Sequence, residues 1–116
     1  MSTNIGQAAE NLVSEYLENL GFEILHKNWK TRWCEIDIVA KRGERVHFIE
    51  VKYRKSHLQG TGLEYITQTK AKQLKQAARW WISENEWQGD YQIDAAGITG
   101  ALKLSNLELV WSAVED

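Results

Sequence analysis

Residues 34–54 read CEIDIVAKRGERVHFIEVKYR, two segments of alternating side-chain character joined by a short polar turn. Alternation with a period of two is typical of β-strands, because successive side chains point to opposite faces of a sheet. The glycine within residues 41–44 favours a turn, so the two segments are predicted to form an antiparallel hairpin. In the first segment, one face is expected to carry Ile36, Ile38 and Ala40, and the other Glu35, Asp37 and Val39.

The register of this hairpin is expected to bring acidic side chains together. A loop of even length centred on residues 43–44 places Asp37 opposite Glu50 and Glu35 opposite Lys52. Directly opposed residues of an antiparallel pair have Cβ atoms about 4.5–5.5 Å apart. One face of the hairpin is therefore predicted to carry two neighbouring carboxylates with an ammonium group beside them.

Such a group of charges suits metal-assisted hydrolysis. Two ionised carboxylates this close repel each other, and Mg²⁺ compensates them while keeping positions for water and phosphate oxygens. A metal there polarises a phosphoryl group and lowers the pKa of a bound water, and Lys52 would orient that water or stabilise charge on the phosphate. The pattern predicts hydrolysis of a phosphodiester.

A simpler interpretation is that these residues lie on a solvent-exposed face. Lys52 would then form ordinary cross-strand ion pairs with Glu35 and Asp37. Against this, Val39 and Phe48 make the same face partly apolar. Carboxylates on a covered face carry a desolvation cost unless they are paired or bound to a metal. Both interpretations remain open at this level.

The rest of the chain supplies helices and further strands. Apolar residues recur with helical spacing in residues 4–20 and 67–83. Residues 22–29 and 91–98 have the character of strands, and a shorter extended pair is expected within residues 101–114. The order helix, three strands, helix, strands predicts a mixed α/β fold with helices packed on a sheet.

Length and composition narrow the class of protein. The chain has 116 residues, which favours one domain over residues 1–116. The single cysteine, Cys34, excludes an internal disulfide framework and a cysteine-based zinc cluster. The sequence contains no apolar run long enough to cross a bilayer and does not begin like a signal peptide, so a cytoplasmic location is expected. Residues 56–62 contain glycine and are predicted to form a mobile loop.

The distribution of charge is uneven although the net charge is only −2. Residues 26–83 contain 13 Lys and Arg against five Asp and Glu, whereas the rest contains one Lys and 11 acids. A basic stretch of this kind is typical of proteins that bind phosphate polymers. It is equally compatible with a solvated helix face next to a charged hairpin.

Several motifs together resemble a known family. They are GQAAE at residues 6–10, Asn28 before the basic Lys30, EIDIVA at residues 35–40, FIEVKYR at residues 48–54, and Ile93-Asp94. Their order along the chain is similar to that of the YraN-type family of nucleases, within the restriction-endonuclease-like PD-(D/E)xK superfamily, and more distantly to archaeal Holliday-junction resolvases. The resemblance implies an αβββαβ core with a central mixed sheet flanked by helices.

The resemblance also implies roles for matching residues. Asp37 and Glu50 would hold Mg²⁺ or Mn²⁺, and Lys52 would be the catalytic lysine. Glu10 would act as a further metal ligand or position water, and Lys70 would contact phosphate. The chain departs from the family pattern where Cys34 replaces a glycine, where Lys30 replaces an arginine, and at Gln68 and Thr69.

DNA is the partner that this resemblance implies, with branched DNA and a homodimer as the extension from the resolvases. We expect the DNA backbone to contact basic residues around the site, namely Lys30, Arg54, Lys70 and Lys72. No membrane partner and no organic cofactor are expected. Two other classes stay open: a non-catalytic nucleic-acid-binding or scaffold protein, and a protein-interaction module. Trp29, Trp33 and Trp87 would either stack on unpaired bases or pack on the core.

Overall fold

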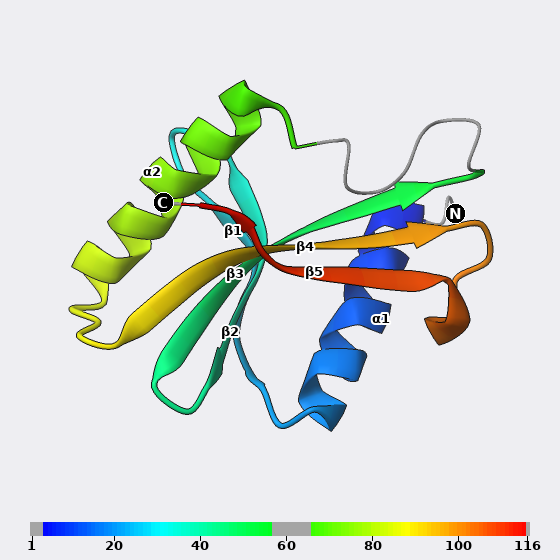
Figure 1. The fold of residues 1–116 in the computed structure, drawn as a ribbon, viewed down its shortest axis with the longest axis horizontal. Coiled ribbons are helices and arrows are strands. Elements are labelled where there is room, and N and C mark those ends of the chain that lie inside the picture. Colours follow the sequence, from blue (N-terminus) through cyan, green and yellow to red (C-terminus); the bar gives the residue numbers. More distant parts are fainter. Residues whose placement is uncertain (1–3, 57–65, 116) are drawn as a thin grey trace.

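The computed structural model describes residues 4–56 and 66–115, and it has the predicted order of elements (Figure 1). The helices and strands are α1 (Ile5–Asn19), β1 (Glu23–Lys30), β2 (Glu35–Arg42), β3 (Arg45–Arg54), α2 (Gln68–Glu84), β4 (Asp90–Thr99), the 3₁₀ helix η3 (Leu104–Asn106) and β5 (Leu107–Val114). This confirms the mixed α/β fold. The loop expected at residues 56–62 lies, from residue 57 onward, outside the described residues.

Both α-helices begin where a short polar residue caps them. The Asn4 side chain accepts a hydrogen bond from the backbone N–H of Gln7 at 3.1 Å, and Thr67 accepts one from the N–H of Lys70 at 3.0 Å. Such caps satisfy backbone donors that have no partner within the first helical turn. The bounds predicted for the two helices are therefore confirmed to within one residue at each end.

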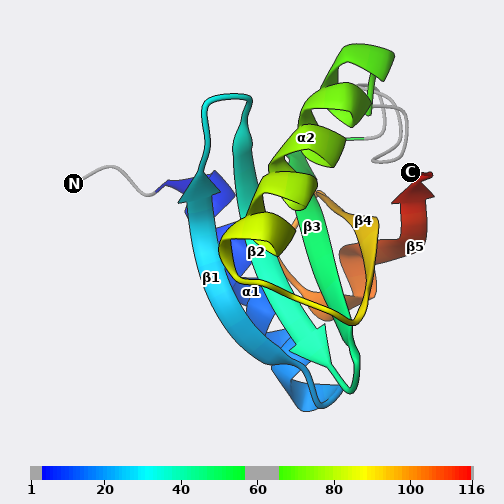
Figure 2. The ribbon, with the colours of Figure 1, turned by 90° about the vertical axis from the view of Figure 1, so that its left-hand side faces the viewer.

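The five strands form one mixed sheet in the order β1-β2-β3-β4-β5. Among the described strands only β3 and β4 are parallel, and α2 lies in the connection between them. The helices cover opposite faces, with α2 in front of the sheet and α1 behind it in Figure 2. Ala9, Val13 and Leu17 of α1 belong to one buried cluster, and a second cluster includes Leu74 and Trp81 of α2.

The predicted hairpin of β2 and β3 is confirmed in both turn and register. Cα pairing runs from Arg42–Arg45 to Ile38–Ile49, the register that an even loop requires. The turn is tighter than residues 41–44, because the strands continue to Arg42 and restart at Arg45. Gly43 has φ 62°, which glycine adopts without the steric cost that a β-carbon would add.

The prediction that Ile36 shares a face with Ile38 is wrong. Ile38 packs in the α1 cluster, whereas Ile36 packs in the cluster of α2. Lys27–Ile38 and Trp29–Ile36 are consecutive pairs of the β1–β2 ladder, and Asn28 lies between them with φ 54°. Regular alternation of the buried faces therefore fails between residues 36 and 38 of β2, beside the left-handed Asn28 of β1.

The shorter extended pair expected within residues 101–114 is also wrong. Only one strand, β5, forms there, preceded by η3. Gly100 turns the chain with φ 86°, and the Asn106 side chain donates a hydrogen bond to the Ala101 carbonyl at 2.8 Å. The segment from residue 101 to 106 closes on itself and cannot extend along the sheet.

No helix in the described ranges combines the length and the apolar character needed to cross a bilayer. The cytoplasmic location and the assignment of residues 1–116 to one domain stay predictions.

Candidate functional site

Asp37 lies at the point where β2 separates from β3. The last Cα pair of their ladder is Ile38–Ile49, one residue before Asp37 is reached. The backbone N–H of Val51 instead donates a hydrogen bond of 2.7 Å to Asp37 Oδ2. The Asp37 carboxyl group thus lies in the fork between the strands and is held by the main chain of β3.

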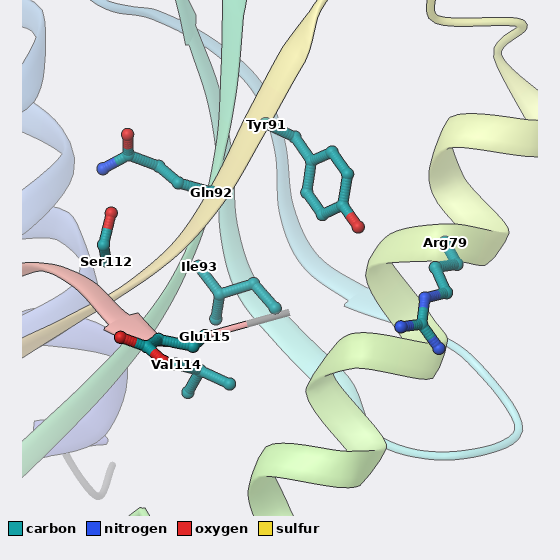
Figure 3. A pocket seen from close by; sticks show the side chains of 7 residues that line it. All are labelled: Arg79, Tyr91, Gln92, Ile93, Ser112, Val114 and Glu115. Atoms are coloured by element: carbon teal, nitrogen blue, oxygen red, sulfur yellow. The ribbon is translucent and has the colours of Figure 1, made fainter.

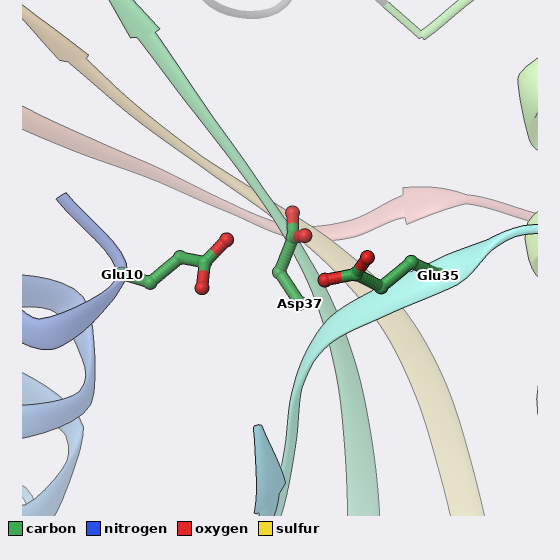
Figure 4. A group of neighbouring side chains, drawn as sticks. All are labelled: Glu10, Glu35 and Asp37. Atoms are coloured by element: carbon green, nitrogen blue, oxygen red, sulfur yellow. The ribbon is translucent and has the colours of Figure 1, made fainter. Parts of the chain in front are cut away.

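Two further carboxylates approach Asp37 from different elements. Glu10 reaches it from α1 and Glu35 from the beginning of β2, and both point towards Asp37 in Figure 4. One oxygen from each of the three groups lies within 4.8 Å of the others. A divalent cation that prefers oxygen ligands fits this set, because Mg²⁺ and Mn²⁺ bind carboxylates and retain positions for water.

Asn28 fixes the position of Glu10. Its amide nitrogen donates a hydrogen bond of 2.6 Å to Glu10 Oε1, linking β1 to α1. Asn28 has φ 54°, a left-handed conformation that asparagine tolerates better than most residues. The irregularity of β1 therefore coincides with a polar contact to the acid cluster, which we define as Glu10, Glu35 and Asp37.

Glu50 adjoins this cluster from β3 and is only 3% exposed. Its Oε2 is buried and has no well-directed hydrogen bond in residues 4–56 and 66–115, although Lys70 Nζ lies 3.2 Å away. Burial, the largest single effect, would lower the pKa of Lys70. Attraction by Glu50 and hydrogen bonding to it, with smaller contributions from Cys34 and Asp37, together outweigh burial and raise this pKa. Lys70 thus stays charged and compensates part of the negative charge.

The crowding of acids changes the ionisation of Asp37. Burial, then hydrogen bonding and repulsion from Glu50, raise the pKa of Asp37 from 3.8 to about 9, against a smaller opposing effect of the Val51 N–H. Asp37 is therefore protonated at neutral pH when no cation is present. A divalent cation can replace the proton of Asp37 and remove the repulsion among the carboxylates. This position therefore gives a bound cation strong electrostatic stabilisation.

The predicted site residues differ in whether they reach the centre formed by the acid cluster and Glu50. Glu10, Asp37 and Glu50 come together as expected, and Lys70 joins them through Glu50. Lys52 follows Glu50 by two residues on β3, but its side chain is exposed and forms no hydrogen bond or ion pair in the described ranges.

Glu35 differs most from its predicted place. It was expected opposite Lys52, but the ladder ends at Ile38–Ile49, before either residue. Glu35 instead belongs to the acid cluster. The sequence signal for it was its spacing of two residues from Asp37.

The expected DNA-contacting residues lie around the site rather than in it. Lys30 is exposed at the end of β1, Lys72 is exposed on α2, and Arg54 is half-buried at the end of β3. Lys70 reaches the centre itself, with its Nζ 3.2 Å from Glu50 Oε2.

The turn between β1 and β2 brings Cys34 next to the site. Burial raises the pKa of the Cys34 thiol, while Lys70 opposes that shift and Glu50 and Asp37 add to it. The Thr31 hydroxyl accepts hydrogen bonds from the N–H groups of Trp33 and Cys34, both at 3.1 Å. Cys34 does not have a positive φ, so this turn accepts cysteine where the family pattern has glycine.

The tryptophans named as stacking candidates, Trp29, Trp33 and Trp87, are partly buried against the α2 cluster. Trp33 also contacts Trp80, which is 47% exposed, with ring centroids 6.0 Å apart. The Arg32 guanidinium lies over the Trp33 ring at 5.5 Å. An aromatic and basic surface therefore begins two residues from Glu35.

A separate open pocket of about 660 Å³ lies between α2 and strands β4 and β5 (Figure 3). Tyr91, Ile93 and Val114 give it an apolar floor, with Arg79 and Glu115 at its sides. None of the predicted site residues lines it. The acidic residues that the sequence singles out therefore lie outside this pocket, at the fork between β2 and β3.

Fold and site together define a small mixed α/β protein with several carboxylates gathered at a break in its sheet. The sequence model of the Uncharacterised protein family UPF0102 matches residues 9–98, and the chain belongs to this family. The matched range includes Glu10, Asp37, Glu50, Lys52 and Lys70.

Individual relatives agree with this assignment. The chain is 36% identical to a UPF0102 protein of Sulfurihydrogenibium sp. over 99 residues, covering 84% of this chain and 86% of that relative. It is 35% identical to a UPF0102 protein of Vibrio campbellii over 97 residues, covering 81% and 80%. It is 38% identical to one of Caldicellulosiruptor saccharolyticus over 82 residues, covering 71% and 70%.

Proposed function

We propose that this protein is a Mg²⁺-dependent DNA endonuclease of the PD-(D/E)xK type. The observation that carries the proposal is the convergence of Glu10, Glu35 and Asp37 within 4.8 Å, with Glu50 adjoining them. The crowding of acids raises the pKa of Asp37 to about 9. A divalent cation bound between these groups would compensate their repulsion, which explains why they lie so close together. Mn²⁺ would fit the same oxygen ligands.

The roles of the surrounding residues follow from their positions. A bound Mg²⁺ would polarise the phosphodiester and would lower the pKa of a coordinated water. Asp37 and Glu50 would hold the ion, and Glu10, oriented by Asn28, would complete the ligand set or accept a proton from water. Lys52, exposed on the strand that carries Glu50, is free to orient the attacking water or to stabilise charge on the phosphate.

DNA is supported as the substrate by the basic half of the chain. Lys30, Lys70 and Lys72 lie on β1 and α2, the elements next to the site. Arg32, Trp33 and the exposed Trp80 add a surface suited to backbone phosphates and unpaired bases. We extend this proposal to a homodimer that cleaves branched DNA.

The test measures metal binding and cleavage separately. Calorimetry with Mn²⁺ should show binding to the native protein that Asp37→Asn weakens by roughly tenfold or more, since a ligand charge is removed. Cleavage of branched and linear DNA should require Mg²⁺ or Mn²⁺ and should fall by at least about 10²-fold in Lys52→Ala. Lys103→Ala, which removes an exposed charge before η3, is the matched control.

The outcomes separate the proposal from its alternative. Metal binding without any cleavage, or cleavage that survives Asp37→Asn, contradicts the nuclease assignment. DNA binding that is unaffected by Asp37→Asn and Lys52→Ala, with no cleavage by the native protein, would instead support a non-catalytic nucleic-acid-binding protein.

A further inference from the structure

A buried histidine–aspartate pair lies on the α1 side of the sheet, near the hairpin turn and away from the acid cluster. His47 Nδ1 lies 2.7 Å from Asp94 Oδ2, and the side chains are 7% and 0% exposed. Asp94 Oδ1 also accepts hydrogen bonds from the Gln92 amide at 2.7 Å and from the Ser112 N–H at 2.8 Å. Both carboxylate oxygens of Asp94 thus have partners. Within residues 4–56 and 66–115, His47 Nε2 is the imidazole atom that remains for another partner.

The backbone of β5 is distorted at this pair. The β4–β5 ladder passes from Ile93–Val114 to Ala95–Val110, so residues 111–113 bulge opposite Asp94. Within the bulge Ser112 has φ 54°, an uncommon conformation for serine. Bulges and strained backbone are frequent where a sheet aims side chains at a ligand. In Figure 3, Gln92 leaves β4 on the side opposite to Tyr91.

The pair opens onto a cavity of about 370 Å³ whose lining is polar and aromatic. Its lining residues are Arg42, Arg45, His47, Gln92 and Trp111. The volume is at the small end of the range for ligand pockets, about 300–1,000 Å³. His47 lines this cavity and is also hydrogen-bonded to the buried Asp94, so the position of its side chain is fixed by the fold.

Contacts with neighbouring residues hold the guanidinium groups of the two arginines that line the cavity. Arg42 lies over the Phe22 ring at 4.4 Å and donates to the Leu20 carbonyl at 3.2 Å. Arg45 donates to Gln92 Oε1 at 2.7 Å and meets Asp90 at 3.4 Å. Asp90 is 75% exposed, so this ion pair is weak. A guanidinium has five N–H donors, and among the residues that the structure describes these contacts leave several of them unused.

Trp111 provides a planar surface beside these charges. Its ring stacks on Phe22 with centroids 6.0 Å apart and an interplanar angle of 9°, and His47 meets it edge-on at 5.7 Å. The residue is nevertheless 42% exposed. An exposed indole held in place by a second ring is suited to stacking against a nucleobase.

We propose that this cavity binds a nucleotide that carries a phosphate monoester, either free or at the end of a nucleic-acid strand. Arg42 and Arg45 match the two charges of the phosphate, His47 Nε2 adds a third polar contact, and Trp111 stacks on the base. This site lies outside the acid cluster, and its binding does not depend on the proposed nuclease activity.

The test uses calorimetry with the full chain in buffer containing EDTA. Deoxyadenosine monophosphate should bind more tightly than inorganic phosphate or deoxyadenosine. Arg45→Ala should weaken that binding by about tenfold or more, as expected for loss of a charge-assisted hydrogen bond. Lys103→Ala, the matched loss of one exposed charge, should change it by less than about twofold. Trp111→Leu should remove the advantage of the nucleotide over phosphate.

Further measurements separate the two sources of phosphate and guard against misfolded variants. Binding of a 5′-phosphorylated single strand, with no binding of its 5′-hydroxyl form, identifies a strand end, and binding of the mononucleotide alone identifies a free nucleotide. In the native protein, NMR signals of the His47 imidazole should shift on nucleotide addition while those of His26 do not. Asp37→Asn should retain the binding even if it has no cleavage activity.

Absence of saturable binding of either phosphorylated ligand at millimolar concentration overturns the proposal. An equal loss in Arg45→Ala and Lys103→Ala, or an unmoved His47 signal, also overturns it.

Discussion

Asp37 is in contact with the main chain of β3 through Val51 and with the neighbouring acids, and its ionisation depends on both. Because its pKa is raised from 3.8 to about 9, the folded protein favours the protonated carboxyl group. The stability that comes from this preference is complete below the pKa of the unfolded chain, near 4. It is lost as the pH rises from there to about 9, when Asp37 must ionise among other acids.

We therefore expect Asp37→Asn to stabilise the metal-free protein at alkaline pH. Asparagine can still accept the hydrogen bond of Val51 but carries no charge, so the variant should gain about 1–3 kcal/mol near pH 8 and little near pH 4. Thermal unfolding in EDTA across this range measures the effect. Glu108→Gln, which changes an exposed acid of β5, is the control, and an equal pH dependence in native protein and Asp37→Asn would refute the assignment.

Strand β1 carries the irregularity that shapes the site. Asn28 combines a φ of 54° with its hydrogen bond to Glu10, and these two contributions can be separated. Asn28→Gly removes the amide but tolerates the backbone conformation, whereas Asn28→Ala removes the amide and adds steric strain.

We predict that Asn28→Ala is less stable than Asn28→Gly by about 1 kcal/mol, and that both variants weaken Mn²⁺ binding to a similar extent. Urea unfolding measures the first difference and calorimetry the second. If Asn28→Gly bound Mn²⁺ as tightly as the native protein, the contact with Glu10 would not position a metal ligand.

The hairpin of β2 and β3 illustrates what the sequence can specify. Its register follows from local features, namely alternation and a two-residue turn that begins with Gly43, so the proximity of Asp37 and Glu50 was predictable. The separation of Glu35 from Lys52 was not predictable, because it depends on where the ladder ends. The burial of Ile36 and Ile38 in different clusters was not predictable either, because it accompanies a left-handed backbone at Asn28 on the neighbouring strand.

The two lysines near the site differ in the same way, because one depends on local pattern and the other on packing. Lys52 was visible from the hairpin alone, since it follows Glu50 on one strand. The contact of Lys70 with Glu50 requires the position of α2 on the sheet, which no local pattern specifies. The bulge at residues 111–113 likewise arises from packing between strands and left no signal in the sequence.

Across the whole molecule, basic residues are concentrated between residues 26 and 83, while the remainder has one Lys and 11 acids. The first part supplies most of β1, the hairpin and α2, and the second includes α1, β4 and β5. If DNA approaches the acid cluster, it should therefore approach along the side formed by α2 and the β1–β2 turn, where Lys72 and Arg32 are exposed.

A matched pair of charge reversals tests this direction of approach. In a background of Asp37→Asn, in which we expect no cleavage, Lys72→Glu should weaken DNA binding and lower the slope of log affinity against log salt by about 1, as for the loss of one phosphate contact. Lys103→Glu makes the same change of net charge in the acidic part and should leave the slope unaltered. Equal effects of the two reversals would contradict an approach along α2. They would show that DNA binding depends only on the net charge of the protein.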